Sequence, residues 1–76
     1  MGRIFLHVEI ASILNENGNR WMTSVEIAQL VNERGLYEKT ARAKTRDVQE
    51  FQIRLRVRNY PHIFEKDGDL IRLVRQ

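Results

Sequence analysis

The sequence predicts a small α+β domain in which three helices precede a C-terminal β-hairpin. Three observations support this class: apolar residues recur at helical spacing near the N-terminus, a capping box opens a second helix, and an Asp-Gly pair separates two apolar-rich runs near the C-terminus. Because 76 residues is the length of one small domain, we expect a single domain over residues 1–76.

The first helix is expected over residues 4–15, which carry two apolar stripes. One stripe consists of Leu6, Ile10, Ile13 and Leu14, and the other of Ile4, Val8 and Ala11. A helix with two such stripes is more apolar than one that buries a single face. Asn17 and Gly18 follow, and this pair tolerates the left-handed conformation that ends many helices.

A second helix is expected over residues 24–34, after a brief strand around Trp21, whose side chain is expected to anchor the core. Thr23 and Glu26 form a capping box, in which the threonine oxygen accepts a hydrogen bond from the third helical amide and the glutamate reaches back. Gly35 is placed to end this helix. Its core-facing side chains are Ile27, Ala28, Leu30 and Val31.

Residues 45–59 are compatible with two secondary structures. The alternation of apolar and polar residues from Phe51 to Arg58 is typical of a strand. As a helix, the segment places Ile53, Val57 and Tyr60 on one face and Val48, Phe51 and Leu55 on the opposite face. We predict a helix over 45–59, because a strand would leave a long structureless loop before it. Which face is buried stays open.

Residues 63–74 are predicted to form an antiparallel hairpin. Pro61 ends the preceding element, and the Asp67-Gly68 pair between two apolar-rich runs predicts a two-residue turn. Tyr60 and Phe64 are expected in the core. The resulting order of helix, short strand, helix, helix and hairpin is that of a winged helix.

Two short segments carry a resemblance to known winged-helix domains. The run Thr23–Val31, ending at Gly35-Leu36, resembles the second helix of many such domains. The run Ile53–Val57, followed by Phe64 and the Asp67-Gly68 turn, is similar to the third helix and wing of HARE-type helix-turn-helix domains. Such domains occur in restriction endonucleases and in chromatin- or transcription-associated proteins. The resemblance therefore implies DNA binding inside the cell, in the cytoplasm of a bacterium or in a nucleus.

Basic residues gather in the second half of the chain. The net charge is +3, but residues 39–58 hold seven basic side chains against Asp47 and Glu50. A stripe of this kind is the usual footprint of a polyanion binder, although a charge run is also found on ordinary solvated faces. In a winged helix the third helix lies against the major groove of DNA, and the hairpin reaches the backbone or the minor groove.

The candidate DNA-binding residues lie on the third helix and the hairpin. They are Lys44, Arg46, Gln49, Gln52, Arg54, Arg56, Arg58, Lys66 and Arg72. Lys44 and Arg46 stand where the third helix is expected to begin, and the free amides of a helix start also hold phosphate. Gln49, Gln52 and Arg56 are capable of bidentate base contacts. Arginines beside a buried helix also serve simply to cover apolar surface.

A protein-interaction or dimerisation module is the alternative function. Its interface would be the two-sided apolar first helix, or an exposed patch of Val48, Phe51 and Leu55. Outward arginines and glutamines favour double-stranded DNA as the partner, whereas such a patch favours a protein partner or a second copy. The sequence is also compatible with one part of a larger parent chain, such as a nuclease or a regulator.

Catalysis, metal binding and membrane insertion are not expected. The sequence has no cysteine, glycine-rich phosphate loop or nucleophile elbow. His7 and His62 lie far apart and have no carboxylate partner at metal-ligand spacing. We therefore expect a protein that is not an enzyme, with no metal and no cofactor. No apolar run in the chain approaches the roughly 20 residues that cross a bilayer.

Overall fold

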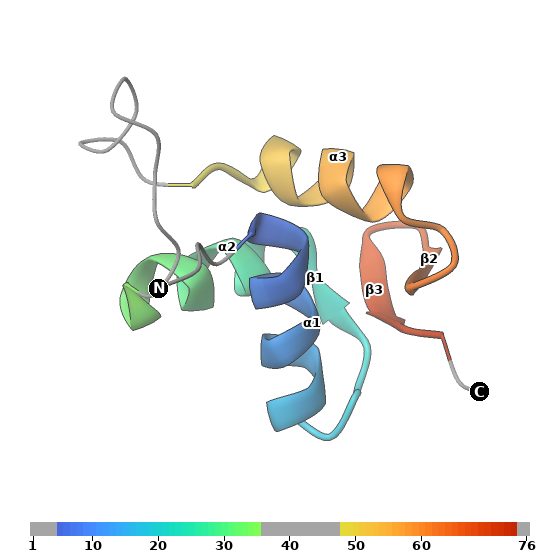
Figure 1. Ribbon diagram of the computed structural model, residues 1–76, viewed down its shortest axis with the longest axis horizontal. Coiled ribbons are helices and arrows are strands. Elements are labelled where there is room, and N and C mark those ends of the chain that lie inside the picture. Colours follow the sequence, from blue (N-terminus) through green and yellow to red (C-terminus); the bar gives the residue numbers. More distant parts are fainter. Residues whose placement is uncertain (1–4, 36–47, 75–76) are drawn as a thin grey trace.

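The computed structural model describes residues 5–35 and 48–74, which form three helices and a three-stranded antiparallel sheet (Figure 1). The elements are α1 (Leu6–Glu16), β1 (Met22–Thr23), α2 (Ser24–Arg34), α3 (Glu50–Asn59), β2 (Phe64–Asp67) and β3 (Leu70–Leu73). The α+β class is therefore confirmed, and the order of the elements is compatible with a winged helix. The predictions for Lys44, for Arg46 and for a helical start at residue 45 lie outside the described residues.

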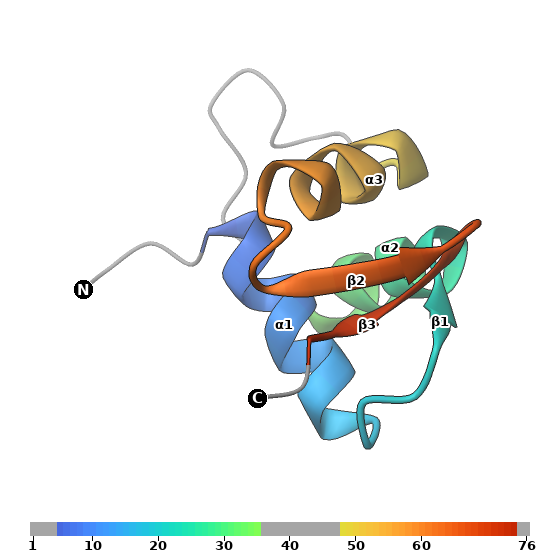
Figure 2. The same ribbon diagram turned by 90° about the vertical axis from the view of Figure 1, so that its right-hand side faces the viewer.

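The sheet joins the first half of the chain to the C-terminal hairpin. Its strand order is β1-β3-β2, with Met22 opposite Ile71 and Phe64 opposite Leu73, so β3 is the central strand. β1 thus pairs with β3, although α2, α3 and β2 lie between them in the sequence. Figure 2 shows the hairpin of β2 and β3 facing the viewer, with α3 above it and α2 behind it.

Each helix contributes one apolar face to the core, and the inward residues of the sheet complete it. The buried apolar residues are Leu6, Ile10, Ile13, Leu14, Met22, Ile27, Ala28, Val31, Val48, Ile53, Val57, Phe64 and Ile71. The first predicted stripe of α1 is buried as a whole, whereas Val8 of the second stripe is 48% exposed. Ala11, Leu30 and Tyr60 are partly buried against this core. Only one side of α1 is therefore fully buried.

α1 runs close to its predicted range, and of the pair expected to end it Gly18 is left-handed whereas Asn17, with a φ of −97°, is not. Phe5 precedes it with an extended backbone and provides no side-chain cap. After the helix, Gly18 and Asn19 take left-handed φ angles of 75° and 55°. The side chain of Asn19 accepts a hydrogen bond from the backbone N–H of Leu73 (2.7 Å) and donates one to its carbonyl (3.2 Å). These two bonds fix the turn after α1 against β3.

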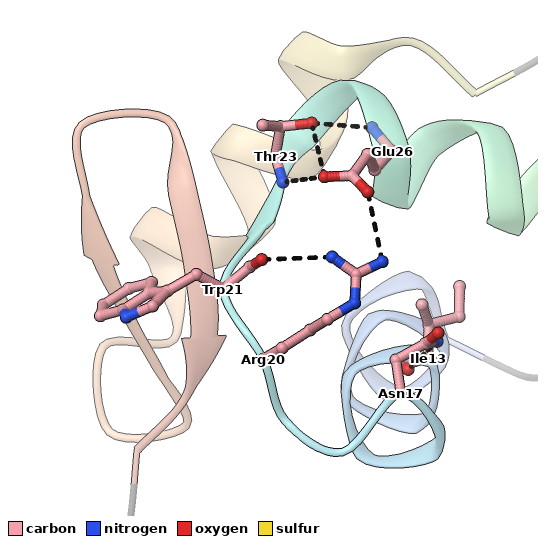
Figure 3. A network of polar contacts seen from close by, with 6 residues as sticks. All are labelled: Ile13, Asn17, Arg20, Trp21, Thr23 and Glu26. Atoms are coloured by element: carbon pink, nitrogen blue, oxygen red, sulfur yellow. Dashed lines mark hydrogen bonds and ion pairs between the residues drawn. The ribbon is translucent and has the colours of Figure 1, made fainter.

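α2 begins at the predicted capping box (Figure 3). The Oγ1 of Thr23 accepts a hydrogen bond from the backbone N–H of Glu26 (3.1 Å), and a carboxylate oxygen of Glu26 accepts one from the backbone N–H of Thr23 (3.2 Å). The bond from Thr23 is the main cause that lowers the pKa of Glu26, and Arg20 is a smaller cause. At the other end, left-handed Gly35 (φ 63°) donates its N–H to the carbonyl of Val31, as predicted.

α3 is a helix, so the strand interpretation of its alternating pattern is wrong. The helix begins at Glu50, and Val48 and Gln49 before it are not helical. The predicted earlier start is therefore wrong at these two residues. The side chain of Asn32 accepts a hydrogen bond from the N–H of Val48 (2.8 Å) and donates one to its carbonyl (3.0 Å). The backbone N–H of Gln49 donates to the side-chain oxygen of Gln52 (2.8 Å), which caps the helix.

The predicted hairpin is confirmed, with its turn one residue later than expected. Asp67 pairs with Leu70, so Gly68 and Asp69 are the two turn residues. Gly68 has a φ of 62°, which suits the first central position of a type II′ turn, where glycine is favoured. The Oδ1 of Asp69 accepts a 2.7 Å hydrogen bond from the Oγ of Ser24. This bond favours a turn that includes Asp69.

Trp21 does not anchor the core, which corrects the expectation from the sequence. It precedes β1 and is only partly buried, while its neighbour Met22 is fully buried. Successive residues of an extended chain point to opposite faces, so Trp21 lies on the outer side when Met22 fills the core. There the guanidinium carbon of Arg72 lies 4.3 Å from the centre of the Trp21 ring.

One carboxylate is buried where α1 packs against α2. Glu9 is 2% exposed, and its Oε2 lies 3.1 Å from the Nε of Arg34. That contact lacks hydrogen-bond geometry, so this oxygen is buried without a hydrogen-bond partner. Arg34 also lies 3.1 Å from a carboxylate oxygen of Glu16. Burial raises the pKa of Glu9, the positive charge of Arg34 opposes the rise, and Glu16 adds to it.

Replacing the cap of α2 tests the start of that helix. Thr23→Ala removes the oxygen that accepts from the N–H of Glu26, and we expect it to destabilise the fold by about 1 kcal/mol. Thr23→Ser keeps the oxygen and should cost much less. Arg20→Ala, which removes only an exposed ion pair with Glu26, is the second control. Urea unfolding measures all three, and an alanine variant as stable as the wild type would contradict the assignment of the cap.

Replacing the buried carboxyl tests its linkage to pH. An acid whose pKa is raised in the folded state contributes stability that is fully present below its unfolded pKa and is lost as the pH rises through its folded pKa. Because the pKa of Glu9 is raised, Glu9→Gln should be at least as stable as the wild type at neutral pH, and this advantage should shrink on acidification. Urea midpoints measured across pH, with exposed Glu33→Gln as control, test this. Marked destabilisation by Glu9→Gln at neutral pH would show that the attraction of Arg34 outweighs the cost of burial.

Candidate nucleic-acid interface

α3 turns two apolar side chains and two arginines away from the core. Ile53 and Val57 face inward and are buried. Because successive helical residues are turned by about 100°, the opposite side carries Phe51, Leu55 and Arg58, and Arg54 lies at the margin of that side; all four are exposed. Figure 1 shows α3 along one edge of the molecule, with α1, α2 and the sheet on its inner side. We call these four residues the outer face of α3.

The two flanks of α3 differ in their contacts. Gln52 and Arg56 lie on one flank and are partly buried. Arg54 lies toward the other flank, where its Nη1 is 3.6 Å from a carboxylate oxygen of Glu50 and donates a hydrogen bond to the Oγ of Ser24 (3.3 Å). The side chain of Arg54 is nevertheless 46% exposed. Arg54 and Arg56 therefore lie on opposite flanks of α3.

Ser24 connects α3 to the turn of the hairpin. Its side chain is fully buried, accepts the hydrogen bond from Arg54 and donates one to Asp69 (2.7 Å). One hydroxyl thus ties together α3, the first turn of α2 and the turn between β2 and β3. No sequence pattern indicates this link, because Ser24 and Asp69 lie 45 positions apart and each has a sufficient local explanation, one in the capping box and one in the turn.

The two predicted cations of the hairpin have different surroundings. Lys66 is exposed and makes no ion pair or hydrogen bond in the described part of the chain. Arg72 lies 3.2 Å from a carboxylate oxygen of Glu65 and stacks on the ring of Trp21. Its Nε is buried without a hydrogen-bond partner. Lys66 is therefore free to meet an anion, whereas Arg72 is held by two neighbours on the sheet.

The structure brings together only part of the predicted site. Arg56 and Arg58, like Lys66, have no ion pair or hydrogen bond within residues 5–35 and 48–74. Gln49 lies at the start of α3, and the oxygen of the Gln52 side chain is used in the cap. Of the predicted apolar patch, Val48 is buried, while Phe51 is 59% and Leu55 43% exposed. The outer face of α3 therefore combines features that favour DNA with features that favour a protein.

Other kinds of site find little support among the described residues. His7 stacks on Tyr60, with ring centres 4.0 Å apart, and His62 lies beyond it on the same aromatic row. Within residues 5–35 and 48–74 no group of three acidic, histidine or cysteine side chains is placed to hold a metal ion. None of the helices in these ranges has the length and the apolar run that a membrane crossing needs.

The comparisons with known proteins give no guide to the function. No family model matches this sequence, and neither the curated proteins nor the solved structures compared with it give a match. The function is therefore inferred from the geometry and charge of the outer face of α3 and of the hairpin beside it.

Removing the carboxylate of the turn tests the link through Ser24. Asp69→Ala leaves the buried hydroxyl of Ser24 without its acceptor, and we expect a loss of about 1–2 kcal/mol, since a hydrogen bond to a charged group is involved. Asp67→Ala removes a neighbouring exposed carboxylate whose side chain makes no hydrogen bond or ion pair within the described residues, and it serves as the control. Thermal unfolding measures both. Equal melting temperatures for the two variants would contradict a stabilising role for this link.

Proposed function

We propose that this chain is a winged helix that binds double-stranded DNA through the outer face of α3. The observation that carries the proposal is the exposure of Arg58 on the side of the helix opposite its buried residues, with exposed Arg54 at the margin of the same face. In winged-helix proteins this helix lies against the major groove. The groove is wide enough for an α-helix, and among the described elements α3 lies at an edge of the molecule (Figure 1).

Electrostatics supply the affinity in this proposal. Each arginine or lysine that neutralises a phosphate releases counterions from the duplex, which favours binding to any sequence. Arg56, Arg58 and Lys66 have no partner among the described residues, so they meet a phosphate without breaking an ion pair. In the sequence, α3 is also preceded by Lys44 and Arg46. The resemblance to HARE-type domains supports the same proposal, and a role in restriction or transcription remains a prediction from it.

The proposal gives the arginines different roles. Arg58 is exposed and unpaired among the described residues, so it is our first choice for a phosphate contact. Arg54 already bonds to Ser24, so its contribution to DNA binding depends on the atoms left exposed. Arg72 is held by Glu65 and Trp21 and is the weakest of the predicted contacts.

A protein-binding module is the second candidate function. It is favoured by one observation, the exposure of Phe51 and Leu55 in the middle of the outer face. Large apolar side chains that lie next to each other on a surface often mark an interface. In that case the neighbouring arginines would contact acidic groups of the partner.

Substitution of single arginines tests DNA binding. Arg58→Ala and Arg56→Ala should each weaken binding to every duplex alike and flatten the plot of log affinity against log salt by about one unit, the effect of losing one phosphate contact. Arg20→Ala is the matched control, since Arg20 belongs to the segment between α1 and β1, at the end of the molecule away from α3 (Figure 1). Fluorescence anisotropy with a labelled random duplex measures the affinities at several salt concentrations.

The same titration separates the two candidate functions. If the wild type binds no duplex even at low salt, or if charge reversal at Arg56 and at Arg58 leaves binding unchanged, the proposal is wrong. The arginines would then be solvated surface, and the protein-binding function would become the better explanation of the outer face.

A further inference from the structure

Two apolar side chains lie at the centre of the surface that we propose for DNA. Phe51 and Leu55 are one helical turn apart, and they are 59% and 43% exposed. The third apolar residue that the sequence groups with them, Val48, is buried and held by Asn32. The exposed apolar surface of α3 is therefore a pair, and the fold itself does not bury it.

The pair lies directly beside the two arginines of the same face. On a helix, residues three or four positions apart are neighbours, so Phe51 adjoins Arg54, and Leu55 adjoins Phe51 and Arg58. A ligand that covers this surface must therefore offer apolar groups and negative charges within one helical turn. Phosphates flank the major groove of DNA on both sides, which satisfies the requirement for charge.

The major groove contains one apolar group on the edges of the four bases. Adenine, guanine and cytosine present hydrogen-bond donors and acceptors there, and thymine alone adds a C5-methyl group. Side chains without polar atoms, such as phenylalanine, contact this methyl group and cannot form hydrogen bonds to the other bases. Covering polar base edges with Phe51 or Leu55 would leave those edges unsatisfied, which is costly.

We propose that Phe51 and Leu55 read thymine methyl groups in the major groove, while Arg54 and Arg58 contact the neighbouring backbone. This inference rests on the proposed DNA-binding function and adds a preference for thymine to it. The preference follows from the position of the pair at the centre of the outer face, opposite Ile53 and Val57. Side chains at that position point most directly toward the floor of the groove when α3 lies in it.

Replacing thymine by uracil isolates the methyl group. The whole chain is titrated with two duplexes of equal length, alternating d(AT) and alternating d(AU), which differ only in the C5-methyl groups. Burying one methyl group changes an affinity by about fourfold, so we expect tighter binding to the thymine duplex by at least that factor. Salt should weaken both complexes in parallel, because the phosphates are the same.

Two variants identify the residues responsible. Phe51→Ala, alone and combined with Leu55→Ala, should reduce the preference for thymine to near one. Val8→Ala, which truncates a similarly exposed apolar side chain of α1, should leave the preference unchanged. Circular dichroism checks that each variant is folded. The comparison of the two duplexes needs no variant, so equal binding by the wild type overturns the inference even if the double variant does not fold, and Phe51→Ala alone tests the source of any preference.

Each contrary outcome has its own meaning. Equal binding of the two duplexes by the wild type overturns the methyl inference and leaves the DNA-binding proposal standing. A thymine preference that survives in Phe51→Ala and in the double variant also overturns the methyl inference, since the preference then arises from a property of the duplexes and not from Phe51 or Leu55. Absence of binding to both duplexes at low salt overturns the DNA-binding proposal itself. If sedimentation shows a dimer that Phe51→Ala dissociates, the pair belongs to a contact between two copies and the inference is wrong.

Discussion

Burial of one side of α3 determines what that helix presents to a partner. Ile53 and Val57 fill the core below the helix, and they fix its rotation about its own axis. Since each helical residue is turned by about 100° from the last, the same rotation places Phe51 and Leu55 outward and divides the arginines between two flanks. The composition of the outer face is thus a direct consequence of core packing. Exposing two large apolar side chains is unfavourable in water, which makes a ligand for them a reasonable expectation.

Core packing fixes the rotation of α3, and a buried hydroxyl sets its relation to the hairpin. Ser24 accepts from Arg54 and donates to Asp69, so the arginine and the hairpin turn share one anchor at the start of α2. A movement of the turn would change the surroundings of Arg54, and a ligand that binds Arg54 would compete with its hydrogen bond to Ser24. The capping box beside it, formed by Thr23, keeps the first turn of α2 in place. Two adjacent residues of β1 and α2 therefore hold the geometry of the proposed interface.

Local patterns in the sequence predict those parts of the structure that have local causes. The cap at Thr23 and the buried stripe of α1 follow from residue spacing alone, and both are confirmed. The prediction fails where a contact between residues distant in sequence determines the structure. The side chain of Asn32 forms hydrogen bonds to the backbone N–H and carbonyl of Val48, and α3 starts later than predicted. The two faces of the third helix are similarly apolar in sequence, so nothing local indicates which one α1 and α2 cover. The exposure of Phe51, and with it the character of the outer face, could not be predicted.

The mixture of apolar and cationic side chains on α3 bears on how a ligand is recognised as well as how tightly it binds. The affinity supplied by ionic contacts of Arg58 decreases steeply with salt concentration and is the same for any duplex. The affinity supplied by contacts of Phe51 is nearly independent of salt and requires an apolar group at a defined place. The affinity at low salt would then reflect mainly charge, and the discrimination between sequences would grow as salt weakens the common ionic part. On a purely cationic face, rising salt would reduce the affinity and leave no separate contact to discriminate between sequences. Interleaving the two kinds of side chain within one helical turn therefore allows general attraction and selective contact to occur in the same bound position.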